Sequence, residues 1–595
     1  MMRCSQATNR SILGRNDMEK LLRQNFKYGV AVGCGLLLTL AVACGTAAEP
    51  SGTTPYTGSS DAPATAPAAS APQQPVATAA PVQQSDSSSS AQQQNEPAEA
   101  AMAERPILNA GVIWLDSPLD PVVSGWVANQ SAMSENLFRL SGSTLSPEPW
   151  LATEATHVDP LTWEIEIRSG VKFHNGNPLD AEAVKASLER AIRLSEAAAD
   201  ILSADTISVK DNQTITITTT VPQPTLPGLL ITPVFGIHDA AAADAAGEGN
   251  FIEARALTGP YIPTAYVQLE RLDSVANDDY WGGIPPLAGI NSIAIPDTSS
   301  RELALQAGDV DLIINVSPDG SQVINANPGT QTATAGLGTA LVLWWVNFER
   351  GTLADPLVRR AVAHAIDRES IAGLVAPSGA GSFAEFMLPE VVVSCPDVQA
   401  PAYDPDEARH LLEDAGYADS DGDGILDRNG EPLEIIIGGY PQRFQLPIMA
   451  EAAQAMLADV GIKVDVQITE WSVVKEPAWD LFGWYNGVVE GGGDPVFNIS
   501  KFAGLRADAG GTGGNNYGYY DNTALAEIVG PSVSVSDIEG RKEIACEALA
   551  IITEETAFLP VAHMNLVFGI SDKVTDFSPH PSSLYFFDHR VGLSE

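Results

Sequence analysis

The sequence predicts an α/β protein with more than one lobe, and two features of the chain after position 104 support this. Short runs rich in β-branched residues alternate with stretches whose apolar residues recur three and four positions apart. This alternation is typical of strands and helices that are layered around a shared core. The chain has 595 residues, which is too long for one ordinary domain.

The expected strands and helices follow one another through the globular part of the chain. Strands are expected at 161–168, 213–220, 265–271, 340–348 and 433–437, and helices at 180–194, 357–372, 404–415 and 447–460. Asp180 is placed to cap the helix that follows it, and Glu182 adds negative charge to the first turn. Pro356 stands where the next helix could begin, because proline fits the first helical position.

The composition is that of a globular and strongly acidic protein. Apolar residues make up 45% of the chain and charged residues 18%, with 32 Lys and Arg against 75 Asp and Glu, for a net charge of −43. Phosphate backbones would repel such a surface, so we expect no nucleic-acid partner. The charge would favour cationic solutes, but an acidic surface equally serves to keep a secreted protein soluble.

Residues 1–43 have the features of a signal peptide. The apolar run 28–43 follows Arg23 and Lys27, and its about 16 residues are fewer than the roughly 20 that a membrane span needs. A start at Met18 would give a leader of more ordinary length, so both starts stay open.

Cys44 and the segment after it predict a lipid anchor on a flexible tether. The run 40–43 before Cys44 resembles a bacterial lipobox, although its leucine stands one position earlier than that pattern prefers. The alternative is an ordinary leader followed by a chance cysteine. Residues 44–104 are rich in Ala, Pro, Ser, Gln and Thr and hold too little apolar surface to fold, so we expect a disordered tether. Lipid at Cys44 would hold the protein at the membrane without a span.

Six blocks of sequence resemble the large two-lobed solute receptors of oligopeptide, dipeptide and nickel importers. The blocks are 148–190, which contains VKFHNG; 258–261 with 277–283; 301–311; Asn347 with 355–368; 403–417; and 461–464. Each block alone is a weak signal, but together they occur in the order of the family. The chain is thus similar to the extracellular solute-binding proteins, family 5, of ABC importers.

The resemblance implies a class II periplasmic-binding-protein-like fold of the large peptide-binding type, in which a hinge joins two α/β lobes. One lobe would combine residues 105–348 with 563–595, and the other would be 349–562. A solute that contacts both lobes binds the closed form better, and a membrane permease then receives it. The resemblance also implies a monomer without a cofactor. The sequence carries no GxxxxGK[ST], GxSxG or HExxH motif, so we expect neither ATP hydrolysis nor other catalysis in this chain.

The resemblance also places candidate ligand contacts. Peptide receptors of this family hold the peptide ammonium with an aspartate three residues before an Asp-Pro pair; here Asp494 precedes a proline, but residue 491 is glycine. Glu490 is adjacent and could replace the missing carboxylate. Arg506 could pair with a carboxylate of the solute through its planar guanidinium. The remaining candidates are side chains for stacking or hydrogen bonding: Trp126, Trp484, Tyr485, Asn516 and Tyr517.

Several ligands remain open at this stage. A peptide-like or other small organic solute is expected first, then a chelated metal such as nickel, then an oligosaccharide. None of the eight histidines lies within 484–522, so a bare nickel ion would lack its preferred imidazole ligands there, whereas a chelate needs fewer protein ligands. A solute sensor that docks on a transmembrane receptor would use the same lobes.

Two further motifs lie outside the expected ligand segments. Cys395 and Cys546 could form a disulfide in an oxidising compartment. Residues 419–427 resemble the start of a calcium loop, but Gly430 stands where an EF-hand needs glutamate. We interpret this segment as a tight acidic turn, with calcium binding as the alternative.

Overall fold

A computed structural model describes residues 105–247, 250–377, 379–470, 478–487, 491–504 and 516–594 of the chain. The expected leader, the tether with Cys44, and two candidate contacts, Glu490 and Arg506, lie outside the described residues. Within these ranges, no helix combines the length and the apolar character that crossing a bilayer would require.

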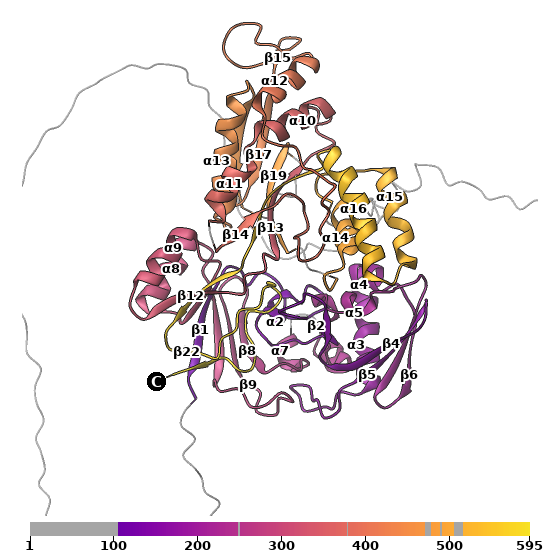
Figure 1. Ribbon diagram of the computed structural model, residues 1–595. Coiled ribbons are helices and arrows are strands. Elements are labelled where there is room, and N and C mark those ends of the chain that lie inside the picture. Colours follow the sequence, from indigo (N-terminus) through magenta and orange to yellow (C-terminus); the bar gives the residue numbers. More distant parts are fainter. Residues whose placement is uncertain are drawn as a thin grey trace, which may run out of the picture. The chain divides into compact units, whose positions relative to one another are not determined.

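A seven-stranded mixed sheet is built from two distant parts of the chain (Figure 1). Its strands, in spatial order, are β12 (Thr330–Thr334), β21 (Val567–Ser571), β11 (Leu312–Ile314), β1 (Ile107–Val112), β10 (Gly289–Ala294), β9 (Arg271–Ala276) and β8 (Tyr261–Val267). The central strand β1 is parallel to both of its neighbours. The helices α8 (Thr298–Ala307) and α9 (Pro318–Ala326) pack together, and α8 also contacts β1, β11 and β21.

A four-stranded antiparallel sheet follows β1 in the sequence. Its order is β4 (Ala152–Asp159), β5 (Thr162–Ile167), β7 (Thr214–Thr219) and β6 (Ala204–Asp211). The predicted cap is present, because the Asp180 carboxylate accepts a hydrogen bond from the Ala183 N–H at the start of α3. The neighbouring short elements are α2 (Trp126–Gln130), β2 (Phe138–Leu140), β3 (Pro147–Pro149), α3 (Ala181–Leu194), α4 (Glu196–Leu202), α5 (Leu226–Leu229), α6 (Ala240–Ala246), α7 (Phe251–Ala254), β22 (Val574–Thr575) and β23 (Gly592–Leu593).

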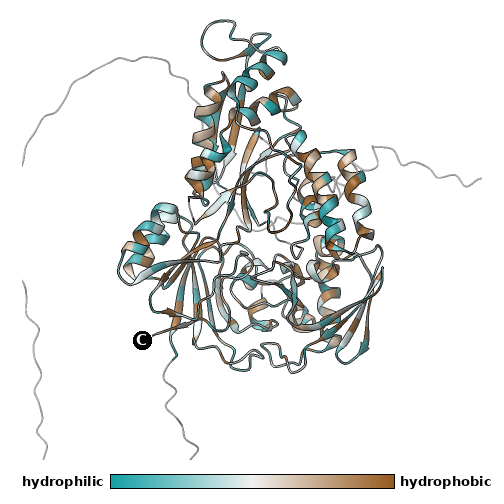
Figure 2. Cartoon of the chain, viewed as in Figure 1, coloured by the Kyte–Doolittle hydropathy of each residue, from teal (hydrophilic) through white to brown (hydrophobic). Residues whose placement is uncertain are grey.

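A six-stranded sheet forms the core of the second part of the fold. Its order is β14 (Gly381–Phe383), β20 (Phe558–Met564), β13 (Ala340–Val346), β19 (Leu481–Gly487), β17 (Glu434–Gly439) and β18 (Lys463–Ile468). Around it lie α10 (Pro356–Ala365), α11 (Arg368–Val375), α12 (Pro405–Asp414), α13 (Gln445–Ala458), α14 (Pro495–Ala503), α15 (Thr523–Val529), α16 (Ile538–Glu554) and the small pair β15 (Asp427–Arg428) and β16 (Glu431–Pro432). Figure 2 shows hydrophilic and hydrophobic residues within the same helices, as expected for helices that bury one face.

The expected helix 357–372 is divided in two. α10 ends at Ala365, and the Asp367 carboxylate accepts a hydrogen bond from the Ser370 N–H to cap the separate helix α11. An aspartate favours a helix start because its oxygen satisfies a backbone N–H that lacks an intrahelical partner.

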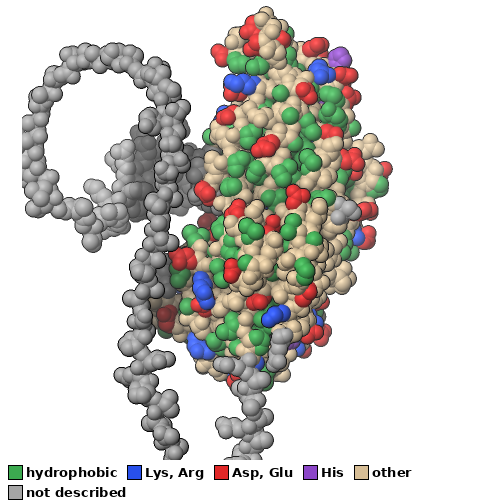
Figure 3. Space-filling view, turned by 90° about the vertical axis from the view of Figure 1, so that its left-hand side faces the viewer, with side chains coloured by type: hydrophobic (Ala, Val, Ile, Leu, Met, Phe, Trp, Pro, Cys, Tyr) green, Lys and Arg blue, Asp and Glu red, His purple; other side chains and the backbone are tan. Residues whose placement is uncertain are grey.

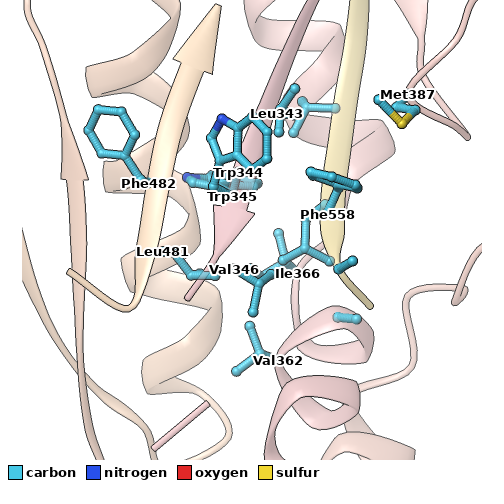
Figure 4. Packing of buried hydrophobic residues seen from close by; sticks show 14 of the residues in the cluster. Leu343, Trp344, Trp345, Val346, Val362, Ile366, Met387, Leu481, Phe482 and Phe558 are labelled. Carbon is cyan, nitrogen blue, oxygen red and sulfur yellow. The ribbon is translucent and has the colours of Figure 1, made fainter. Parts of the chain in front are cut away.

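The strand β13 lies at the centre of a large apolar core. All seven of its residues are buried, and β19 and β20 are hydrogen-bonded to its two edges. Trp345 lies opposite Phe482 of β19 and Phe558 of β20, with 4.8 Å between the ring centroids of Trp345 and Phe558 (Figure 4). Aromatic pairs at this distance add to the stabilisation that burial of their apolar area provides.

The apolar clusters indicate where the two lobes divide. The buried residues of one apolar cluster all lie between 340 and 564. The buried residues of the two other large clusters all lie outside this range, except for Val392. The expected boundaries at 348/349 and 562/563 would separate β13 and the end of β20 from the sheet to which they are hydrogen-bonded. We therefore propose that lobe I is 105–339 with 565–594, and that lobe II is 340–564.

A disulfide joins Cys395 and Cys546 within lobe II. The Cα atoms are 5.4 Å apart, and the bond connects the long loop before α12 to α16. The pairing that the sequence left open is therefore formed in this structure.

Because two histidines are buried, we expect the protein to lose stability in mild acid. Burial lowers the pKa of His174 and of His563 from 6.5 to about 4. As the pH falls below 6.5, the unfolded chain binds protons that the folded chain does not, so the free energy of unfolding should fall by about 3 kcal/mol per histidine by pH 4. Urea unfolding at stepped pH should show a smaller fall for His174→Gln than for the wild type. The same change at the exposed His410 is the control for the substitution itself.

Candidate functional site

A cavity of about 350 Å³ lies between the two lobes. Lobe I contributes residues that follow β1 and residues of α2, and lobe II contributes residues that follow β17 and residues of β19. A volume of this size falls in the range of pockets that hold small organic ligands.

The position of the cavity follows from the directions of the strands. β1 and β17 each lie between two parallel neighbours, and the chain leaves each strand at its carboxyl end. In open α/β sheets, ligands bind outside the carboxyl ends of parallel strands. Trp114 and Asp116 follow β1, and Tyr440 and Arg443 follow β17, so both sheets direct residues toward one space.

Arg443 is the one basic residue among the described residues that line the cavity. Its guanidinium carbon lies 3.9 Å from the ring centroid of Tyr485 and 4.7 Å from that of Trp114, which belongs to the opposite lobe. Within the described ranges, no carboxylate forms an ion pair with Arg443, and its Nε has no hydrogen-bond partner. The aromatic rings hold the cation in place and leave its hydrogen-bonding capacity for a ligand.

Aromatic side chains form much of the cavity wall. Trp484 packs against Tyr440, with centroids 6.3 Å apart, and Tyr440 reaches across to Trp114 of lobe I at 6.4 Å. The Tyr440 hydroxyl accepts a hydrogen bond from the Tyr485 N–H, and burial raises the pKa of Tyr440 to about 12. The phenol therefore stays neutral at physiological pH, and the wall suits the apolar part of an organic solute.

Asp116 is the one carboxylate among the described lining residues of the cavity. Burial raises the pKa of its carboxyl group above the ordinary value. The cavity thus offers one cation on lobe II and one acidic group on lobe I. The strong negative charge of the protein lies elsewhere, and Figure 3 shows acidic side chains scattered over one outer face of the molecule.

Three of the predicted contacts line the cavity: Trp126 at the start of α2, and Trp484 and Tyr485 in β19. Tyr517 is not part of the lining, but it packs on Trp484, with ring centroids 4.9 Å apart. Tyr517 therefore contacts a residue of the cavity wall, Trp484, without lining the cavity itself.

Two other predicted contacts have structural partners instead. Asp494 is buried, caps α14 by accepting from the Val496 N–H, and pairs with Arg541 through bonds of 3.0 and 2.5 Å. Asn516 is also buried, and its amide nitrogen donates to the carbonyls of Gly504 and Tyr520. Neither side chain belongs to the cavity lining.

The sequence reasoning did not find Trp114, Asp116, Tyr440 or Arg443. A signal for two of them was present, because the expected strand 433–437 ends shortly before Tyr440 and Arg443. Residues that follow a parallel strand are candidates for ligand contacts, but the sequence alone did not show that β17 is parallel to its neighbours.

The acidic segment 419–427 forms the expected turn. The Asp419 carboxylate accepts hydrogen bonds from the N–H groups of Gly422 and Gly424. Carboxylate oxygens of Asp419, Asp421 and Asp423 lie within 4.8 Å of one another, but all three residues are exposed and none lines the cavity.

Two α/β lobes with a ligand-sized cavity between them define a two-lobed solute-binding protein. The model of the family described as "Bacterial extracellular solute-binding proteins, family 5 Middle" matches residues 146–504, which is more than half of the chain. The chain belongs to this family, and the predicted family and fold are confirmed. It is an extracytoplasmic solute-binding receptor of an ABC importer.

Known relatives support this assignment along most of the chain. Heme-binding protein A of Haemophilus influenzae is 26% identical over 468 residues, which cover 73% of this chain and 82% of that protein. Nickel-binding protein NikA of Staphylococcus aureus is 25% identical over 436 residues, which cover 73% and 83%. The structure of that NikA in complex with Ni(L-His)2 has a TM-score of 0.72 at 23% identity, covering 82% of this chain and all of NikA. The oligopeptide-binding protein AppA of Bacillus subtilis, solved with a nonapeptide, has a TM-score of 0.71 at 21% identity, covering 83% of this chain and all of AppA.

Proposed function

We propose that this receptor captures a small peptide-like solute that carries a carboxylate, and that it delivers the solute to a membrane permease. The observation that supports this most is Arg443, a cation in the inter-lobe cavity with no carboxylate partner in the described part of the chain. The carboxylate of a solute would supply that partner. Asp116, on the opposite lobe, is placed to receive an ammonium group.

A metal chelate is the second candidate ligand. One relative is named for nickel binding, and its structure holds nickel with histidine. The described residues that line the cavity include neither histidine nor cysteine, so a metal would have to arrive inside an organic chelate. Carboxylates of that chelate would then meet Arg443. An oligosaccharide is a third candidate, because the aromatic walls could stack on sugar rings.

A thermal-shift screen of the full chain separates these candidates. The panel is trialanine, trialanine amide, nickel with histidine, and maltotriose. A solute at 100 times its Kd should add about 2.7 kcal/mol to the free energy of unfolding. We expect stabilisation by trialanine and a much smaller effect of the amide, which lacks the carboxylate. Equal stabilisation by trialanine and its amide would contradict the role of Arg443. If nickel with histidine is the only panel member that stabilises the protein, the ligand is a metal chelate.

We also propose that the protein is a monomer anchored by lipid at Cys44, with residues 44–104 as its tether. The lipobox-like sequence supports this anchor. Cys44→Ser should move the protein from the membrane fraction to the soluble extracytoplasmic fraction. Mass analysis of the wild type should find acyl chains on Cys44, and their absence would refute the anchor. A solute sensor would use the same lobes as a transport receptor. Co-purification with a permease would identify the transport receptor and argue against the sensor.

A further inference from the structure

A second contact joins the two lobes away from the cavity. Residues 491–494 of lobe II lie against Leu145 and Pro147 and against 225–228 of lobe I. None of these residues lines the cavity. A solute in the cavity therefore does not touch this contact, although both depend on how the lobes meet.

The contact brings backbone against backbone. Gly491, Gly492 and Gly493 have φ angles of 69°, 69° and 73°, in the left-handed region that side chains other than glycine rarely adopt. A Cβ atom on Gly228 would lie 2.4 Å from the carbonyl oxygen of Gly491, and one on Gly493 would lie 2.5 Å from that of Leu145. No side chain fits at these positions while the lobes touch.

One hydrogen bond crosses the same contact. The Thr225 hydroxyl of lobe I donates to Oδ2 of Asp494 in lobe II, at 3.1 Å. Asp494 is held in place because it caps α14 and pairs with the buried Arg541 of α16. The acceptor is therefore fixed within lobe II, and lobe I supplies only the donor.

We propose that the three glycines 491–493, together with Gly228 and the Thr225–Asp494 bond, form a latch that holds the lobes closed. This inference rests on the proposed function, in which solute binding and closure are linked. A contact that exists only in the closed form raises the closed population, and the apparent affinity for a solute rises in proportion. The latch thus sets affinity from outside the ligand site.

Gly228→Ala tests the latch. Gly228 lies in α5 with a φ angle that alanine can adopt, so lobe I itself should accept the methyl group, whereas the closed contact should not. We expect the ligand-free unfolding midpoint to stay the same and the affinity for trialanine, or for nickel with histidine if that panel member binds, to fall about tenfold or more. Gly373→Ala in α11 is the matched control, because nothing lies within 4 Å of its added Cβ. Unchanged affinity in Gly228→Ala would overturn the latch.

A second readout keeps the latch testable if no panel solute binds. We expect the ligand-free wild type to populate both the open and the closed form, so without solute the radius of gyration of Gly228→Ala should be larger than that of the wild type and of Gly373→Ala in solution scattering. Identical scattering of all three would overturn the latch. If no panel solute stabilises the protein but Gly228→Ala has the larger radius of gyration, the proposed ligands are contradicted and the latch is supported.

Discussion

Replacing Arg443 by methionine should weaken the binding of trialanine by about 30-fold or more while the fold stays intact. Loss of one partner of a desolvated charge pair costs about 2–5 kcal/mol, because the other charge is left without compensation. Methionine keeps much of the apolar contact with the Tyr485 and Trp114 rings but brings no charge. Titration calorimetry of the full chain measures the difference.

Two further variants make this result specific. Arg443→Lys keeps the charge but loses the planar group that stacks between the rings, so its affinity should lie between those of the wild type and Arg443→Met. Arg409→Met is the matched control, because Arg409 lies on the exposed side of α12 beside Asp406. Binding by Arg443→Met as tight as that of the wild type would show that the solute carboxylate lies elsewhere.

Removing the disulfide should have the largest effect on stability. Cys395 and Cys546 are separated by 151 positions, so their bond greatly restricts the unfolded chain. We expect Cys395→Ala combined with Cys546→Ala to lower the free energy of unfolding by about 3–5 kcal/mol. Affinity for the solute should change little, because neither cysteine lines the inter-lobe cavity.

A reductant provides the control for the disulfide. Dithiothreitol should lower the unfolding midpoint of the wild type toward that of the double variant, and it should leave the double variant unchanged. Equal midpoints of wild type and double variant without reductant would show that the bond contributes no net stability.

Local sequence signals predicted most of the named elements, because their causes are local, but the expected strand 265–271 is wrong, since this range covers the end of β8 and the turn to β9. The cap at Asp180 and the start of α10 at Pro356 depend on residues within one helical turn. The lobe boundary depends on long-range pairing, which these signals do not contain. Strand β13 was expected, but its pairing with β19 and β20, on which our proposed assignment to lobe II rests, joins residues more than a hundred positions apart.

The lining of the inter-lobe cavity, which is the candidate ligand site, was predicted less completely for a related reason. Trp484 and Tyr485 were predicted because large aromatic residues in the family's ligand segment favour stacking, and both line the cavity. Asp494 does not line the cavity, and an aspartate followed by proline is also a typical helix start; α14 and Arg541 engage its carboxylate. Arg443 had only one sequence signal, its place shortly after the expected strand 433–437, and that signal does not reveal a ligand contact. Its position follows from the parallel neighbours of β17.

The measurement that tests the central claim most directly is solution scattering with and without the solute that stabilises the full chain most. If the solute binds between the lobes, saturation should lower the radius of gyration of the wild type, because the bound solute favours the closed form. Arg443→Met at the same solute concentration should remain at the ligand-free value. If the solute binds and stabilises the wild type but its scattering does not change, the claim that the solute binds between the lobes and closes them would be contradicted.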